Sequence, residues 1–167
     1  MASPSGTDAK VVLLGRHDVG KTSLVERFSH GRFKENLSMT VGAAFSSKTL
    51  TVNGKPFTLG IWDTAGAERY ESMTKQYYKS ANFAIVCYDI TDRASFDKAR
   101  FWIGQLNNQE PDAAIALVGT KCDLVKSAKH AKDCVPLAEV EGCARLQLVM
   151  YDSITIVRYQ VFPSRSR

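Results

Sequence analysis

The sequence is poor in cysteine and has no apolar run long enough to cross a bilayer. The four cysteines, at positions 87, 122, 134 and 143, form no C-x-x-C pair and are too sparse for a disulfide-stapled secreted scaffold. The first residues also lack the charged segment followed by an apolar one that marks a signal peptide. We therefore expect reduced thiols, a cytoplasmic location and no transmembrane segment.

Charge of one sign is nowhere concentrated, and the chain has no internal repeat or low-complexity tract. The 22 Lys and Arg residues outnumber the 17 Asp and Glu residues, but the two signs are interleaved. This pattern favours a solvated surface over an electrostatic footprint for nucleic acid or anionic lipid. The length of 167 residues and the 44% of hydrophobic residues suit one globular domain with a real core.

What the sequence does contain is an alternation of short apolar runs with helical patterns. We expect strands at 10–14, 43–52, 57–62, 83–88 and 113–118, and helices at 21–30, 68–80, 95–106 and 137–144. Asn53 and Gly54 predict a tight hairpin because both residues tolerate positive φ. The expected fold class is therefore α/β, with a mainly parallel sheet, one antiparallel edge hairpin and helices on both faces.

The most informative motif is Gly15-x-x-x-x-Gly20-Lys21-Thr22, which stands between an expected strand and an expected helix. This order suits a phosphate-binding loop, whose backbone N–H groups curl around phosphates at a helix N-terminus. Lys21 would reach the β- and γ-phosphates, and Thr22 would offer its hydroxyl to Mg²⁺. A glycine-rich turn with a helix-capping Thr22 is the alternative, and it does not explain Lys21.

A second motif, Trp62-Asp63-Thr64-Ala65-Gly66, follows the strand that should lie beside the first one. Asp63 can hold a water of the Mg²⁺ shell, and Gly66 lets a backbone N–H approach a γ-phosphate with no side chain in the way. A solvated turn is the alternative interpretation. Only the position of the motif after Lys21 favours the functional one.

The third motif, Gly119-Thr120-Lys121-Cys122-Asp123, comes directly after the expected strand 113–118. Asp123 is suited to accept hydrogen bonds from the N1–H and N2 amine of guanine, whereas adenine offers no such pair of donors. Alone, Lys-x-Asp is most often a solvated loop pair. Here the motif lies at a strand end that faces the same crevice, so the prediction narrows to a guanine nucleotide.

With these three motifs the chain resembles the Ras superfamily of small GTPases, and most closely its Rab branch, over residues 10–148. The Rab character rests on VGAAF at 41–45, GIWDTAGAERY at 60–70, YYKSA at 77–81 and VCYDIT at 86–91. The resemblance implies a P-loop NTPase fold and GTP/GDP with Mg²⁺ as cofactors.

The resemblance also implies roles for individual residues. Thr40 would contact Mg²⁺ and the γ-phosphate only in the GTP state, and Phe33 would pack on the guanine edge; both lie in a stretch without periodicity. The catalytic residues would be Lys21, Thr40 and Gly66, and the metal-binding residues would be Thr22, Thr40 and Asp63. The nucleotide contacts would come from Gly15, Asp18, Val19, Gly20, Lys21, Thr22, Ser23, Phe33, Thr40, Gly66, Thr120, Lys121 and Asp123.

Three aromatic residues match the trio with which Rab proteins present their switch state to effector proteins. These residues are Phe45, Trp62 and Tyr77. The alternative is that they form ordinary partial core.

The chain departs from the family pattern at the position after Gly66, where Ala67 replaces the usual Gln. A methyl group cannot orient the water that attacks the γ-phosphate, so we predict slow intrinsic GTP hydrolysis. His17 and Asp18 also stand where small residues are usual, and we expect the Asp18 carboxylate to turn outward. Thr120 replaces the usual Asn, and the lost hydrogen bond should weaken nucleotide retention by about 1 kcal/mol.

The last part of the chain departs most. We divide the sequence into a flexible leader at 1–9, a small GTPase domain at 10–148 and a divergent segment at 149–167. The divergent segment has no counterpart of the family's closing helix, could complete one strand at 149–162, and predicts an exposed apolar patch. With no cysteine after Cys143, we expect no prenyl anchor in this form, and we interpret the chain as a truncated isoform.

These patterns predict a GTP/GDP switch of vesicle trafficking that acts through effector and regulatory proteins. An alternative is a truncated isoform that acts as a non-switching interaction protein with weak or no nucleotide binding. A third possibility, a phosphate-loop kinase of small nucleotides, lacks a recognisable Arg-rich lid, and Asp123 argues against it.

Overall fold

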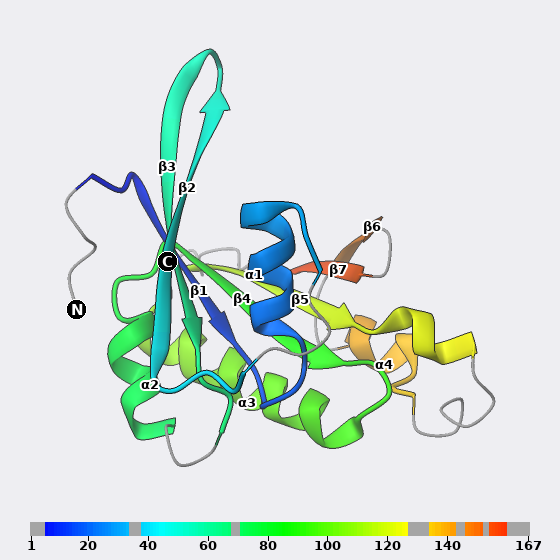
Figure 1. The fold of residues 1–167 in the computed structure, drawn as a ribbon. Helices are drawn as coiled ribbons and strands as arrows, with labels where there is room; N and C mark the ends of the chain where they lie inside the picture. Colours follow the sequence, from blue (N-terminus) through cyan, green and yellow to red (C-terminus); the bar gives the residue numbers. More distant parts are fainter. Residues whose placement is uncertain are drawn as a thin grey trace, which may run out of the picture.

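A computed structural model describes residues 6–33, 38–67, 71–126, 134–142, 146–151 and 154–159. The elements follow one another as β1 (Ala9–Leu14), α1 (Lys21–His30), β2 (Ala43–Val52), β3 (Lys55–Thr64), α2 (Glu71–Tyr78), β4 (Phe83–Asp89), α3 (Arg93–Gln109), β5 (Ala114–Thr120), the 3-10 helix η2 (Cys122–Lys126), α4 (Leu137–Gly142), β6 (Leu146–Tyr151) and β7 (Ile154–Tyr159). All seven of these strands belong to one sheet in the order β2-β3-β1-β4-β5-β7-β6 (Figure 1).

The centre of the sheet is parallel, as the alternating pattern predicts. Strand β1 pairs in parallel with both β3 and β4, and β4 pairs in parallel with β5. Every residue of β1 is buried, which agrees with a strand covered on both faces. The carboxyl ends of these strands therefore meet at one edge of the sheet, where α1 begins.

The predicted edge hairpin is confirmed. Strands β2 and β3 are antiparallel, with Val52 opposite Lys55. Between them Asn53 and Gly54 have φ of 51° and 74°. Two successive residues with positive φ give the turn a twist that matches the flanking strands. The hairpin extends well beyond the rest of the sheet (Figure 1).

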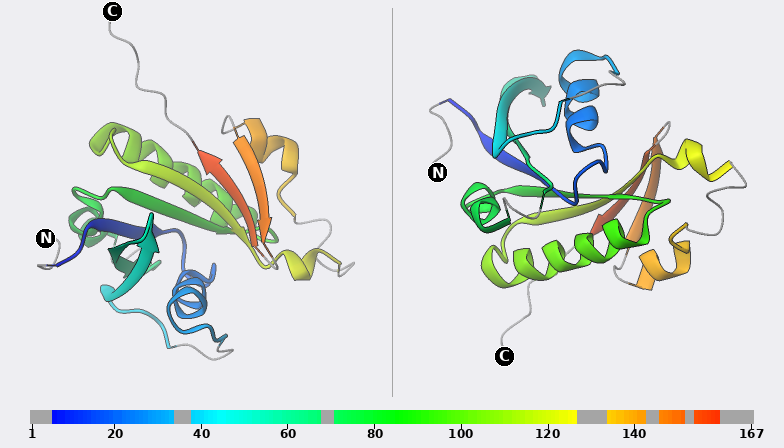
Figure 2. Two further views of the ribbon diagram at one scale, coloured as in Figure 1. Left: turned by 90° about the horizontal axis from the view of Figure 1, so that it is seen from above. Right: turned by 60° about the horizontal axis from the view of Figure 1, so that its bottom comes forward.

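Helices cover both faces of the sheet, as predicted. In Figure 2, α1 lies on one face, and α3 lies on the other with α4 beside it. The face under α3 holds the larger apolar cluster, which includes Val86, Phe96, Leu106 and Leu117, all less than 1% exposed. The face under α1 holds the smaller clusters around Leu13 and Cys87.

The smaller side of the core leaves apolar surface in contact with solvent. Alternate residues of β4 face opposite sides, and Ala84 and Val86 on the α3 side are 1% and 0% exposed. On the α1 side Phe83 is 47% exposed and Ile85 is half-buried. Within the described ranges, no helix combines the length and the apolar character needed to cross a membrane.

The last two strands differ from the sequence expectation of one strand at 149–162. Strands β6 and β7 form a second antiparallel hairpin, and β7 pairs antiparallel with β5. Only two residues separate β6 from β7, which permits an antiparallel connection and no parallel crossover. The predicted fold class with its edge hairpin is confirmed, and β6 and β7 add a second antiparallel hairpin where one strand was expected.

Candidate functional site

A cavity of about 390 Å³ opens beside the N-terminus of α1. Its lining comes from the loop before α1, from the segment before β2, from the end of β3 and from the loop after β5. The lining residues are His17, Asp18, Gly20, Lys21, Thr22, Ser23, Phe33, Ser38, Met39, Thr40, Thr64, Gly66 and Lys121. Residues from all three sequence motifs therefore meet around one space.

The loop before α1 has the curled backbone expected of a phosphate loop. Gly15, Asp18 and Gly20 have φ of 140°, 60° and 89°. A Cβ at Gly15 would overlap the carbonyl oxygen of Cys87, so the close approach of β4 requires glycine there. Glycine at this position thus allows the loop to curl directly against β4.

Lys21 is buried within this loop. Its Nζ donates hydrogen bonds to the carbonyl oxygens of Gly15 at 2.9 Å and Arg16 at 2.8 Å. Burial lowers the pKa of Lys21, and the nearby carboxylate of Asp63 partly offsets this effect. The hydrogen bonds given for this ammonium within the described ranges go to neutral carbonyl oxygens, so its charge is still able to bind an anion in the cavity.

Three side-chain oxygens gather near Lys21. The hydroxyls of Thr22 and Thr40 lie 3.1 Å apart, and the Thr22 hydroxyl also hydrogen-bonds Asp63. Asp63 is 3% exposed, and its Oδ1 has no hydrogen-bond partner among the described residues. Burial raises the pKa of Asp63. An unsatisfied buried carboxylate oxygen beside two hydroxyls fits Mg²⁺, which prefers oxygen ligands.

Gly66 lies against the phosphate loop. A Cβ at this position would overlap the backbone nitrogen of His17 and the carbonyl group of Arg16, so glycine is required. The close approach places the backbone of β3's carboxyl end directly beside the loop. Ala67 follows and is half-buried.

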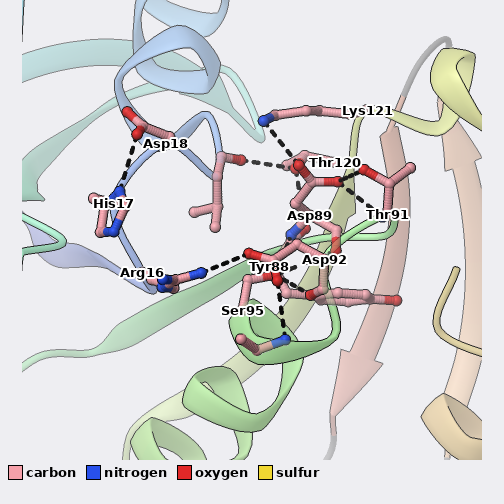
Figure 3. Close-up of polar contacts among 12 residues, drawn as sticks. Arg16, His17, Asp18, Tyr88, Asp89, Thr91, Asp92, Ser95, Thr120 and Lys121 are labelled. Carbon is pink, nitrogen blue, oxygen red and sulfur yellow. Dashed lines mark hydrogen bonds and ion pairs between the residues drawn. The ribbon is translucent and has the colours of Figure 1, made fainter. Parts of the chain in front are cut away.

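Asp18 is directed outward, as predicted. Its side chain is 90% exposed, and its Oδ2 lies 2.9 Å from Nδ1 of His17 (Figure 3). The hydrogen bond with His17 lowers the pKa of Asp18. The negative charge that would repel a phosphate is therefore turned away and partly satisfied.

At the other end of the cavity Lys121 has a φ of 61°, and its Nζ lies 2.8 Å from Oδ2 of Asp89. Burial acts to raise the pKa of Asp89, but hydrogen bonds from Lys121 and Thr91 outweigh it and lower the pKa. The ammonium of Lys121 is thus fixed at the cavity wall by a carboxylate on β4 (Figure 3).

The Thr120 hydroxyl connects the loop after β5 with two neighbouring segments. It is buried and lies 2.7 Å from the carbonyl oxygen of Val19 and 3.0 Å from that of Tyr88 (Figure 3). The hydroxyl therefore still connects this loop with its neighbours, and the weaker nucleotide retention stays a prediction. The loop after β5 approaches the phosphate loop closely enough that a short hydroxyl spans the gap.

Nine of the predicted nucleotide contacts line the cavity, and four do not. Gly15, Val19 and Thr120 lie behind the wall and hold its backbone through the hydrogen bonds described above. Asp123 lies outside the lining, exposed at the start of η2 and two residues beyond Lys121. Of the predicted metal ligands, Thr22 and Thr40 line the cavity and Asp63 lies just behind them.

Four lining residues escaped the sequence prediction: His17, Ser38, Met39 and Thr64. Thr64 stands between two predicted residues, and its hydroxyl donates to the carbonyl oxygen of Leu13 at 2.6 Å. Ser38 and Met39 precede Thr40 in the aperiodic stretch. Only their proximity in sequence to predicted residues could have identified them.

The three rings of the predicted aromatic trio lie next to one another, with Trp62 in contact with both of the others. The ring centroids of Phe45 and Trp62 are 5.2 Å apart, and those of Trp62 and Tyr77 are 5.8 Å apart. Phe45 is 41% exposed. The three rings thus join β2, β3 and α2 and present part of their surface to solvent.

Comparisons with known proteins agree with this architecture. The model of the Ras family matches residues 10–156. Ras-related protein Rab-24 of Dictyostelium discoideum is 48% identical over 138 residues, which cover 83% of this chain and 67% of that protein. Ras-like GTP-binding protein RYL2 of Yarrowia lipolytica is 50% identical over 127 residues, which cover 75% of this chain and 61% of that protein.

Ras-related protein Rab5A of Oryza sativa subsp. japonica is 50% identical over 139 residues, which cover 83% of this chain and 66% of that protein. The chain thus spans about two thirds of the length of the curated relatives it matches. The matched region includes the phosphate loop, the segment around Gly66 and the loop after β5. By this family match and these identities, the chain belongs to the Ras family of small GTPases, in its Rab branch.

Proposed function

We propose that the chain is a GTP/GDP-binding switch of vesicle trafficking, and that the cavity beside α1 is its nucleotide site. The observation that carries the proposal is the buried Lys21, held by the curled loop next to residues of the two other motifs. In this role the backbone of 15–22 and Lys21 bind the phosphates. Phe33 and Lys121 flank the base, and Asp123 accepts from guanine.

Thr22, Thr40 and Asp63 are the residues that would hold Mg²⁺. When bound, this cation neutralises charge on the β- and γ-phosphates. The 3.1 Å contact between the Thr22 and Thr40 hydroxyls supports the assignment because it brings Thr40 to the cavity. Thr40 belongs to the segment before β2, so its position can report which nucleotide is bound.

Hydrolysis in this site is slow. Lys21 and the Gly66 backbone stabilise the γ-phosphate, but Ala67 supplies no hydrogen-bonding group for the attacking water. The chain therefore stays in the GTP state longer than a relative with Gln at this place. Effector proteins read that state from the segment around Thr40 and from the trio Phe45, Trp62 and Tyr77.

The test is the nucleotide content of the purified chain and its exchange with and without Mg²⁺. We expect bound GDP or GTP and faster release when EDTA removes the cation. A folded protein that stays empty at millimolar GDP would instead support a non-switching interaction protein. The position of Asp123 outside the cavity lining is the observation that favours this second candidate.

A further inference from the structure

We propose that His17, oriented by Asp18, is a catalytic residue that positions the attacking water in place of the side chain missing at Ala67. The inference rests on the proposed function of the cavity as a GTP site. It concerns the only histidine among the residues that line the described cavity.

His17 lies at the γ-phosphate end of the cavity. The backbone of Gly66, whose N–H faces the γ-phosphate in the proposed function, packs directly on the backbone nitrogen of His17. Ala67 is the next residue along the chain. His17 thus lines the cavity where its backbone contacts Gly66, the residue before Ala67.

The hydrogen bond with Asp18 determines which ring nitrogen of His17 carries a proton. The carboxylate Oδ2 of Asp18 lies 2.9 Å from Nδ1 of His17, and an ionised carboxylate can only accept hydrogen bonds. Nδ1 must therefore carry a proton, and in the neutral form of the ring Nε2 is then the acceptor. Within the described part of the chain Nε2 has no partner, and the His17 side chain is 38% exposed, so water can reach it.

These features define one step. A water donates a hydrogen bond to Nε2, and its oxygen forms a bond to the γ-phosphorus. The bond between that phosphorus and the β–γ bridging oxygen breaks, and its electron pair leaves with GDP. One proton of the water stays on the released phosphate and the other passes to solvent. His17 touches the reacting water, whereas Asp18 acts through His17 and is a positioning residue.

The experiment is single-turnover hydrolysis of GTP by the loaded full chain, after GDP affinity has been measured for each variant. We expect His17→Ala to lower the hydrolysis rate about 10-fold with GDP affinity unchanged. His17→Asn, too short to reach the same water, should show the same loss. Asp18→Asn should lower the rate about threefold, because its amide can donate as well as accept and no longer fixes the tautomer.

The matched control is His30→Ala. His30 is an exposed histidine at the end of α1 whose Nδ1 lies 3.7 Å from Glu26, and it is outside the cavity lining. This variant removes the same kind of His–carboxylate pair, and its hydrolysis rate should equal that of the unaltered chain.

A double-mutant cycle separates the proposal from a general effect of the loop. Ala67→Gln should raise the rate, and in that background His17→Ala should change it less than twofold, because both side chains serve the same water. An unaltered or faster rate in His17→Ala, or the same factor of loss in both backgrounds, would overturn the proposal. Absence of GDP binding by the unaltered chain would overturn the proposed function itself.

Discussion

At the end of the cavity where we propose that phosphate binds (the phosphate end), one continuous segment, 15–22, supplies the backbone and the buried Lys21. At the end beside Lys121, where we propose that the base binds (the base end), contacts join distant parts of the chain. The Thr120 hydroxyl bonds the carbonyl of Val19, which is 101 residues away. Lys121 is held by Asp89 on the neighbouring strand. In the proposed function, the main phosphate-binding groups come from one segment, although Cys87 and Gly66 pack against it, while guanine recognition requires loops from separate strands.

The largest expected effect comes from Lys21→Ala at the phosphate end. The variant removes the buried ammonium, and loss of charge-assisted hydrogen bonds to phosphate costs roughly 3 kcal/mol, about 100-fold in affinity. Titration with a fluorescent GDP analogue measures it. Lys55→Ala, at an exposed lysine of the β2–β3 hairpin, is the control and should bind normally. Affinity retained within threefold in Lys21→Ala would contradict the assignment of the phosphate end.

Asp63→Asn should raise the stability of the nucleotide-free protein and abolish the effect of Mg²⁺ removal on nucleotide release. The folded-state pKa of Asp63 is above its ordinary value of 3.8, even with Lys21 nearby, so the folded chain binds the proton more tightly than the unfolded chain. The unfolding free energy of the nucleotide-free protein therefore falls as pH rises from about 3.8 through the folded-state pKa.

Replacement by Asn removes this pH-dependent component and should raise the unfolding free energy at neutral pH by about 1–2 kcal/mol. At the same time, nucleotide release should no longer respond to EDTA. Urea denaturation between about pH 4 and pH 8 measures the first effect, and nucleotide release measures the second. A variant less stable than the unaltered chain at neutral pH would show that Asp63 is not an uncompensated charge.

The smallest expected effect is that of Thr120→Ala on GDP release, which tests the base end of the cavity. Thr120→Ala removes the hydroxyl that connects the loop after β5 with Val19 and Tyr88, which should cost about 1 kcal/mol and speed GDP release about fivefold. Thr120→Ser keeps the hydroxyl and is the matched control. Equal release rates for the Ala and Ser variants would mean that these hydrogen bonds do not support nucleotide retention.

The difference between the two ends also explains what the sequence could predict. The strand, loop and helix around Gly15 and Lys21 follow from local pattern, and the structure contains them at the expected places. The role of the Thr120 hydroxyl depends on how closely separate loops approach, which no local pattern encodes. The hairpin of β6 and β7 escaped prediction because a run of strand-forming residues does not say where the chain reverses.

The exposed site residues remain predictions. Asp123 follows Lys121 by two residues but lies outside the cavity lining, so its role depends on chemistry and not on a contact within the chain. A carboxylate at this place distinguishes guanine from adenine only if the base reaches it.

Competition between GDP and ADP for the site tests the central claim most directly. With Mg²⁺ present, the unaltered chain should bind GDP at least about 100-fold more tightly than ADP, because buried or oriented hydrogen-bonding groups reject a ligand that cannot pair with them. Asp123→Ala should lose most of this preference for GDP over ADP and should still bind the phosphates of either nucleotide. Equal affinities for GDP and ADP in the unaltered chain would contradict a guanine-nucleotide switch.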